Sequence, residues 1–167
     1  NPGPVNVTGR VRKALLGPDI CHREPEFSNL LKEIKKILLG LFGVSKTHAL
    51  AVFTGSGTTA LEAMLSSLAD SNKKILVLSN GVYGQRIQSI LKIHGIPIHV
   101  LESPLGSFPE LRDIDFILKL DASIHAVAMV HHETSTGMLN PLEGVASLAK
   151  KHRKLFLVDA ISSLGAE

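Results

Sequence analysis

Apolar residues recur every three or four positions along residues 26–41, which predicts an amphipathic helix. After this helix, short apolar runs alternate with further stripes of helical spacing. The runs predict buried strands at residues 48–53, 74–78, 97–101, 124–130 and 155–158. The stripes predict helices at residues 58–68, 83–93, 114–120 and 142–152. Strands that are apolar on both faces and separated by helices favour a three-layer α/β fold, with a mostly parallel sheet covered on each side.

The composition fits a folded globular protein. Its 167 residues are enough to bury a substantial core, and a content of 44% hydrophobic and 20% charged residues excludes intrinsic disorder. The longest apolar run, residues 37–44, is far shorter than the roughly 20 residues that cross a bilayer. The single cysteine, Cys21, cannot form an internal disulfide, and no leader segment opens the sequence. The expected location is the cytoplasm, with no membrane partner.

The net charge is +3, from 18 Lys and Arg against 15 Asp and Glu, and the basic residues are scattered except at residues 150–154. This run ends a predicted helix, where cations interact favourably with the helix dipole, so a solvated cap is favoured over a nucleic-acid patch. Tyr83 is the only tyrosine, and there is no tryptophan. Because the aromatic residues of a base-stacking surface are missing, no nucleic-acid partner is expected.

A glycine-rich segment, residues 54–59, lies between a predicted strand and a predicted helix. Glycines allow a tight turn and a helix N-terminus attracts anions, so the segment suits a phosphate, although an ordinary helix cap explains it equally well. Gly55, Gly57 and Ala60 also satisfy a dinucleotide-binding fingerprint. That interpretation requires an acid after the next strand, where residues 79–81 are serine, asparagine and glycine, so it is disfavoured. The sequence contains no Walker motif.

Three further polar clusters follow predicted strands. Residues 80–86 place Tyr83 between two glycines, with room to lie over a planar ligand or simply to pack at the rim. Residues 131–137 favour a hydroxyl-rich binding loop, because adjacent histidines point to opposite sides of an extended chain and make a poor metal site. Asp159 directly follows an apolar run, so its carboxylate needs a cationic ligand, a buried arginine or a helix-capping role.

Motifs containing these clusters run along almost the whole chain. They are Pro2-Gly3-Pro4, Gly-Ser-Gly-Thr at 55–58, Asn-Gly-x-Tyr-Gly at 80–84, His-x-Glu-Thr-x-Thr-Gly-Met-Leu-Asn-Pro at 131–141 and Val-Asp-Ala-x-Ser-Ser at 158–163. Together they resemble the class V pyridoxal-phosphate-dependent aminotransferases, of fold type I. The resemblance is closest to 2-aminoethylphosphonate:pyruvate transaminases, which are similar also at residues 19–24, and less close to alanine:glyoxylate aminotransferases.

The resemblance implies a set of residues that bind pyridoxal 5'-phosphate. They are Ser56, Gly57, Thr58, Tyr83, Thr134 and Asp159. In the family, the glycine-rich loop holds the cofactor phosphate and the aromatic residue stacks on the pyridine ring. The threonine lies near the phenolic oxygen of the cofactor, and the aspartate pairs with the protonated ring nitrogen. Such an ion pair keeps the ring an effective electron sink.

The family also uses a lysine that forms a Schiff base with the cofactor, and it comes after the Val-Asp-Ala motif. We expect this lysine beyond Glu167, so no catalytic residue is assigned within the sequence. The expected organisation is an N-terminal segment with its helix at 1–45 and a partial large cofactor domain at 46–167, without the small C-terminal domain. We expect such a chain to be inactive alone, and the strand at 48–53 to lack its neighbours.

The reaction implied by the resemblance converts 2-aminoethylphosphonate and pyruvate to phosphonoacetaldehyde and alanine. The substrates would then be a small amine and a 2-oxo acid, and the assembly a homodimer. Alanine:glyoxylate or serine:pyruvate exchange is the alternative within the same cofactor class. Cysteine desulfuration is less favoured, because no cysteine occupies a candidate catalytic loop. A non-catalytic remnant that binds a phosphate ligand or a protein is the alternative from another class.

Overall fold

The computed structural model describes residues 6–68 and 72–166. Pro2, Gly3 and Pro4 of the N-terminal motif lie outside the described residues. The described residues divide into two compact units, one formed by residues 6–53 and the other by residues 54–68 and 72–166.

The first unit contains α1 (Gly9–Ala14) and α2 (Pro25–Leu41), the latter confirming the helix predicted from the apolar stripe. Proline suits the first position of α2, since it has no amide hydrogen that the helix would leave unpaired. The chain leaves the helix through Gly43, whose φ of +66° is a left-handed conformation that glycine adopts readily.

The strand predicted at residues 48–53 is wrong, since this segment is irregular. An apolar run is necessary for a buried strand but does not supply hydrogen-bonding neighbours. No described strand pairs with residues 48–53. Val52 and Phe53 are 49% and 52% exposed, so the run is not buried either.

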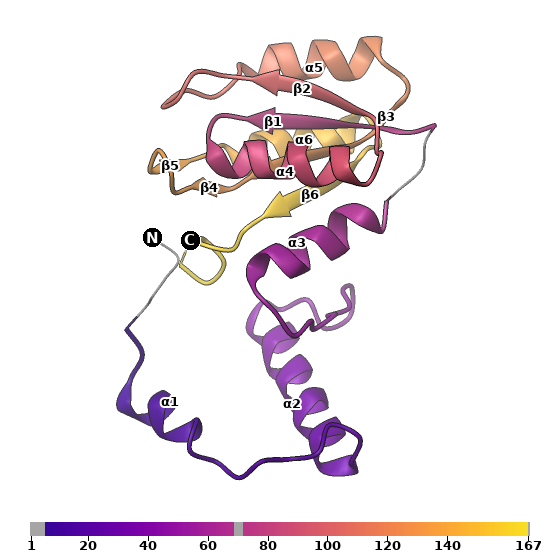
Figure 1. The fold of residues 1–167 in the computed structure, drawn as a ribbon. Helices are drawn as coiled ribbons and strands as arrows, with labels where there is room; N and C mark the ends of the chain where they lie inside the picture. Colours follow the sequence, from indigo (N-terminus) through magenta and orange to yellow (C-terminus); the bar gives the residue numbers. More distant parts are fainter. Residues whose placement is uncertain (1–5, 69–71, 167) are drawn as a thin grey trace. The chain divides into compact units, whose positions relative to one another are not determined.

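The second unit alternates helices and strands as the sequence predicts (Figure 1). Its elements are α3 (Gly57–Ser66), β1 (Lys74–Ser79), α4 (Val82–Ile93), β2 (Ile98–Glu102), α5 (Leu111–Leu120), β3 (Ile124–Val130), β4 (His132–Glu133), β5 (Met138–Leu139), α6 (Leu142–Lys151) and β6 (Leu155–Asp159). The four longer strands form one parallel sheet in the order β2-β1-β3-β6. The strands predicted at 74–78, 97–101, 124–130 and 155–158 are therefore confirmed.

The sheet lies between two layers of helices, as the three-layer prediction requires. Alternate residues of a strand point to opposite faces, so Ile75 and Val77 pack in one core with α3 and α4. Leu76 and Leu78 pack in a second core with α5 and α6. Both cores are built from the apolar stripes that predicted the helices, which is why the sequence pattern was sufficient to give the layers.

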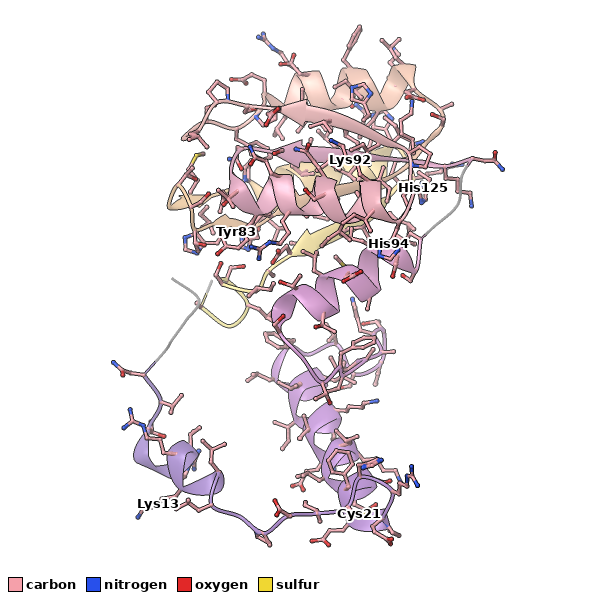
Figure 2. The ribbon with its side chains drawn as sticks, viewed as in Figure 1. Lys13, Cys21, Tyr83, Lys92, His94 and His125 are labelled. Atoms are coloured by element: carbon pink, nitrogen blue, oxygen red, sulfur yellow. The ribbon has the colours of Figure 1, made fainter. Side chains whose placement is uncertain are left out.

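Parallel pairing brings the carboxyl ends of all four strands to one edge of the sheet. The register places Ser79 of β1 beside Glu102 of β2, and Val130 of β3 beside Asp159 of β6. The short antiparallel hairpin β4–β5 follows β3 at the same edge. Figure 2 shows Tyr83 at the corresponding end of α4, whereas His94 lies at the opposite end of this helix.

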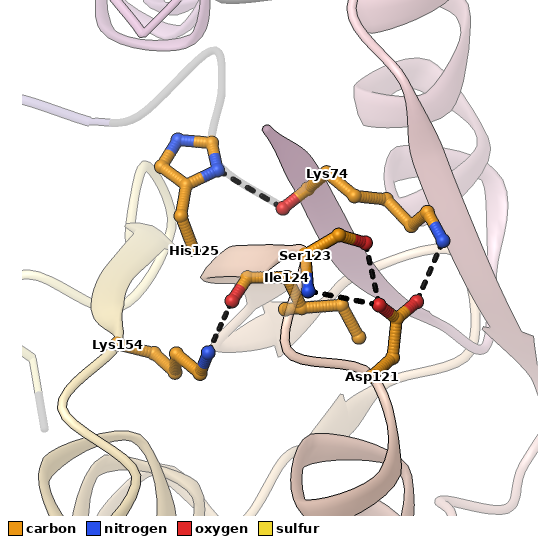
Figure 3. A network of polar contacts seen from close by, with 6 residues as sticks. All are labelled: Lys74, Asp121, Ser123, Ile124, His125 and Lys154. Carbon is orange, nitrogen blue, oxygen red and sulfur yellow. Dashed lines mark hydrogen bonds and ion pairs between the residues drawn. The ribbon is translucent and has the colours of Figure 1, made fainter. Parts of the chain in front are cut away.

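A polar network joins the amino ends of the strands at the other edge (Figure 3). Lys74 Nζ lies 2.6 Å from Asp121 Oδ2, and the amide of Ser123 donates to Asp121 Oδ1 at 3.0 Å. The hydrogen bond from Lys74 is the main reason that the pKa of Asp121 falls from 3.8 to about 2. Lys154 Nζ donates to the carbonyl oxygen of Ile124, which joins β3 to the segment before β6.

The basic run at residues 150–154 overlaps the end of α6. Lys150 and Lys151 lie in the last turn of the helix. Asp115 of α5 accepts hydrogen bonds from Lys151 Nζ at 2.7 Å and is paired with His152 Nε2 at 2.7 Å.

Over the ranges 6–68 and 72–166, no helix has the length and apolar character needed to span a membrane.

Candidate functional site

The glycine-rich segment forms a tight turn that leads into α3. Gly55 has a φ of +156°, and a Cβ atom there would lie 2.5 Å from Thr59 Oγ1, so the turn requires glycine. Ser56 is the N-cap residue of α3 but makes no side-chain capping bond. Neither its hydroxyl nor that of Thr58 forms a hydrogen bond with another described residue. The start of α3 therefore offers hydroxyl and amide donors at the positive end of a helix dipole.

The start of α3 lies against the loop that follows β6. A Cβ atom at Gly57 would approach Ile161 Cδ1 to 2.6 Å, so the absence of a side chain allows this contact. A hollow opens beside it, lined by Gly57, Ala60, Leu61, Met64, Val158, Asp159, Ala160 and Ile161. Asp159 and the first turns of α3 thus face the same space, although Ser56 and Thr58 do not line it.

A second hollow adjoins the first and shares Asp159 with it. Its lining is Tyr83, Val130, His132, Thr134, Asp159, Ile161 and Ser162. Three of the residues assigned from the sequence, Tyr83, Thr134 and Asp159, therefore meet around one space although they come from three different segments of the chain. The hydroxyl of Thr134 has no hydrogen-bond partner within the described residues.

Asp159 is buried, at 6% exposure, and its charge is only partly compensated. Oδ1 accepts a hydrogen bond from the amide of Ile161 at 3.0 Å, and no ion pair joins the carboxylate to a described lysine, arginine or histidine. Burial is the main cause that raises its pKa; the negative charge of Glu133 adds to this, while the Ile161 amide and the charge of Arg86 oppose it. A cationic ligand would stabilise this carboxylate, whereas the buried arginine partner considered from the sequence is not found among the described residues.

Tyr83 is half-buried in the first turn of α4 (Figure 2). The guanidinium carbon of Arg86, one helical turn further on, lies 5.1 Å from the centroid of its ring, a cation–π distance. Tyr83 and Thr134 also line a third hollow together with Val82 and Ser135. Tyr83 therefore lines two hollows, and its ring is in cation–π contact with the arginine of its own helix.

Glu133 is a residue of the site that the sequence reasoning missed. Its side chain is fully buried, and Oε2 accepts the amides of Tyr83 at 3.2 Å and Gly84 at 3.1 Å. Oε1 accepts the hydroxyl of Ser135 at 2.5 Å, and this hydroxyl oxygen accepts the amide of Val82 at 3.1 Å. One sequence signal could have revealed the contact: the residue before α4 is glycine, which has no side chain to cap the helix.

A buried amide pair, also missed, fastens the β4–β5 hairpin to the end of β1. Asn80 Nδ2 donates to Asn140 Oδ1 at 2.8 Å, and Asn140 Nδ2 returns a bond to Asn80 Oδ1 at 3.2 Å. Asn140 Nδ2 also donates to the carbonyl of Val130 at 2.8 Å. Both asparagines belong to motifs noted in the sequence. The sequence does not show, however, that their side chains pair with each other.

The two histidines after β3 have separate partners. His131 Nδ1 lies 2.9 Å from the hydroxyl of Ser163, and the carbonyl of His132 accepts the hydroxyl of Ser162 at 3.1 Å. These bonds join the hairpin segment to the loop after β6. The described part of the chain contains no group of three or more His, Cys, Asp or Glu residues that could hold a metal ion.

Sequence comparisons with known proteins give one family. The profile of the family described as "Aminotransferase class-V" matches residues 13–167. A 2-aminoethylphosphonate–pyruvate transaminase of Pseudomonas putida (strain GB-1) is 38% identical over 165 residues, which are 99% of this chain and 45% of that protein.

Solved structures give the same result for the fold. Ureidoglycine–glyoxylate aminotransferase of Bacillus subtilis matches with a TM-score of 0.88 and 30% identity, over 99% of this chain and 43% of its own. Alanine–glyoxylate aminotransferase of Nostoc sp. matches with a TM-score of 0.87 and 31% identity, over 98% of this chain and 43% of its own. The chain thus spans less than half the length of each of these relatives.

Proposed function

The chain belongs to the class V aminotransferases, which are pyridoxal-phosphate enzymes, and on this premise we propose that it forms the cofactor-ring and phosphate-binding part of a transaminase. The observation that carries the proposal is Asp159. It is a buried carboxylate at the carboxyl edge of a parallel sheet, without an ion-pair partner among the described residues, and it lines the hollow that Tyr83 and Thr134 share. Ligands of open α/β sheets bind at this edge.

The residues present fit the cofactor by their chemistry. A protonated pyridine nitrogen would supply the cation that the buried carboxylate of Asp159 does not find among the described residues. The ring of Tyr83 offers an aromatic face, and the unpaired hydroxyl of Thr134 can bond a phenolic oxygen. When bound, pyridoxal phosphate supplies the electron sink for amino-group transfer.

We assign the phosphate to the start of α3. Gly57 lines the hollow next to Asp159, and the adjoining hydroxyls of Ser56 and Thr58 form no bonds with described residues. An anion there would meet free amides, hydroxyls and the positive end of the helix dipole. These three residues would hold the phosphate, while Asp159 would pair with the charged ring nitrogen.

The covalent attachment of the cofactor needs a lysine from elsewhere. None of the residues that line the hollows beside Asp159 is a lysine. We therefore propose that the lysine characteristic of the family lies beyond Glu167 in the whole protein. We also propose a domain boundary, with an N-terminal segment at 1–45 and the cofactor domain from 46 onward. A cytoplasmic location and a homodimeric assembly are proposed as well.

For the substrates, we propose 2-aminoethylphosphonate as amino donor and pyruvate as acceptor in the whole protein. The name of the Pseudomonas putida relative, at 38% identity over 99% of the chain, supports this choice. Alanine:glyoxylate exchange is the second candidate, favoured by the structural likeness to the Nostoc enzyme.

The test expresses the full reading frame that contains this chain and assays it with pyridoxal phosphate. Formation of alanine from pyruvate, dependent on 2-aminoethylphosphonate, is the expected result. Glycine formed from glyoxylate and alanine, with no reaction of the phosphonate, would establish the second candidate instead. If neither reaction occurs in a protein that binds the cofactor, the proposed substrates are wrong, while the binding role of the chain stands.

A further inference from the structure

The start of α4 is held by a segment that lies far away in the sequence. Gly81, its N-cap residue, makes no side-chain cap bond. Instead, Val82 donates to Ser135 Oγ, while Tyr83 and Gly84 donate to Glu133 Oε2. The first three amides of the helix, which no intrahelical acceptor can reach, are thus all satisfied by residues 133–135.

The contact is close enough to dictate the residue on the other side. A Cβ atom at Gly81 would run into Cγ and Cδ of Glu133 and would lie 2.7 Å from Ser135 Oγ. The φ of Gly81 is −178°, an extended conformation that any residue adopts. Glycine is therefore required here by the space that the Glu133 side chain occupies and not by the backbone angle.

Capping alone does not explain a fully buried carboxylate. A serine or asparagine at the N-cap position of a helix can cap it locally, with no charge taken out of water. What a local cap could not do is join α4 to the hairpin segment. Glu133 holds the amide of Tyr83 and is the residue immediately before Thr134, so it links the two elements whose side chains share a hollow with Asp159.

We propose that Glu133 is a positioning residue, which fixes Tyr83 and Thr134 on the wall of the cofactor hollow. The inference rests on the proposed function, because it is the pyridoxal ring that these two side chains would contact. Glu133 itself lines none of the three hollows described above, so its effect on a ligand passes through its neighbours.

The sequence provides a probe for this role. Tyr83 is the only tyrosine and there is no tryptophan, so the intrinsic fluorescence of the chain reports on Tyr83 alone. Acrylamide quenching and fluorescence anisotropy then measure how accessible and how mobile this ring is, without any cofactor. Glu133→Ala should increase the quenching and lower the anisotropy, because the amides of Tyr83 and Gly84 lose their acceptor.

Glu133→Gln should restore the fluorescence values of the wild type. The amide oxygen of glutamine can accept both amides that Oε2 accepts now, and its NH2 group can donate to the Ser135 hydroxyl. The long bond from the Ser135 amide to Oε1, at 3.3 Å, is lost. Gly81→Ala perturbs the same contact from the other side, and it should shift Tyr83 in the same direction as Glu133→Ala while leaving the carboxylate in place.

Binding is measured by equilibrium dialysis with pyridoxamine 5'-phosphate, which has the ring and phosphate of the cofactor but no aldehyde to react with surface lysines. Glu133→Ala should weaken the affinity of the chain for pyridoxamine phosphate about tenfold. A tenfold change corresponds to the free energy of about one charge-assisted hydrogen bond. Asp121→Asn is the matched control, because Asp121 also accepts a serine amide and hydroxyl but at the opposite edge of the sheet. It should change neither the Tyr83 fluorescence nor the affinity.

The outcomes separate the positioning role from the proposed function. The positioning role is supported if Tyr83 fluorescence changes in Glu133→Ala and in Gly81→Ala and returns to the wild-type values in Glu133→Gln. This holds even if the wild type fails to bind pyridoxamine phosphate. That failure would count against the proposed function. Unchanged fluorescence in Gly81→Ala overturns the proposal, and this variant decides the matter if Glu133→Ala does not fold. A fluorescence change as large in Asp121→Asn would equally overturn it, since it would show a loss of general stability.

Discussion

Replacing Asp159 by asparagine should stabilise the chain at neutral pH in the absence of cofactor, although it removes a residue of the proposed site. The carboxylate is buried, accepts the amide of Ile161 at 3.0 Å and forms no ion pair with a described residue. Its pKa is raised from the ordinary value of 3.8, chiefly by burial and further by the charge of Glu133, against the opposing effects of the Ile161 amide and Arg86. Folding therefore disfavours the ionised form of Asp159 relative to its protonated form.

The magnitude follows from two opposing changes. Burial of an incompletely paired ion costs several kcal/mol, which asparagine avoids. The hydrogen bond from Ile161 weakens by about 1 kcal/mol when its acceptor becomes neutral. A net stabilisation of about 1 to 2 kcal/mol corresponds to a rise in melting temperature of roughly 2 to 8 °C for a chain of this length.

The effect should depend on pH in a defined direction. A carboxyl group whose pKa is raised on folding contributes most to stability below its unfolded pKa, here 3.8, and loses that contribution as the pH rises through its folded pKa. Asparagine does not titrate. The advantage of Asp159→Asn should therefore be small near pH 4 and should widen toward pH 7.

Differential scanning calorimetry of both chains over this pH range measures the difference. Asp121→Asn is the control, since its carboxylate, at the other edge, has a pKa lowered to about 2 by Lys74 and should stabilise the fold when ionised. An Asp159→Asn chain that melts below the wild type at pH 7, with unchanged circular dichroism, would refute the reasoning. It would mean that the fold itself compensates the charge of Asp159.

Three further results are expected. Asp121→Asn should lower the melting temperature at neutral pH. The wild type loses stability as the pH falls from 3.8 toward about 2, and thermal melts in acid should show a smaller loss in Asp121→Asn. Tyr83→Ala should weaken pyridoxamine phosphate binding about tenfold in equilibrium dialysis, while Tyr83→Phe, which keeps the ring, should stay close to wild type. In the full-length protein, Asp159→Asn should slow single-turnover amino transfer by roughly 100-fold or more and Ser162→Ala far less; a cofactor-loaded Asp159→Asn enzyme within a few-fold of wild type would leave Asp159 a structural acid.

The layers of the second unit could be predicted from the sequence because they depend on local periodicity. The stripe in α4 and the apolar run in β1 each bury one set of residues in the same core, with Ile87 and Ile75 among them. The residues at the strand ends could be predicted as well, since parallel strands bring their carboxyl ends to one edge. Tyr83, Thr134 and Asp159 are therefore found around one hollow, as the motifs suggested.

The irregular segment at residues 48–53 shows where periodicity is insufficient. Its apolar run is indistinguishable from that of a buried strand, yet a strand exists only when a neighbour offers amides and carbonyls in register. Whether such a neighbour is at hand is a property of the assembled fold.

The amino-acid sequence by itself determined the elements, their order and the residue types at the sheet edge, because these follow from spacing along the chain and from motifs. Tertiary structure alone decided which side chains and amides form hydrogen bonds with one another at this sheet edge. Glu133 and Gly84 are 49 residues apart, and Asn80 and Asn140 are 60 apart, yet each pair is in hydrogen-bond contact. No local pattern records such a contact, since a carboxylate acquires its partners only after the sheet has brought distant loops together. The same physical reason applies to Asp159, which forms no ion pair with a described residue, a fact that is visible only once the positions of its neighbours are fixed.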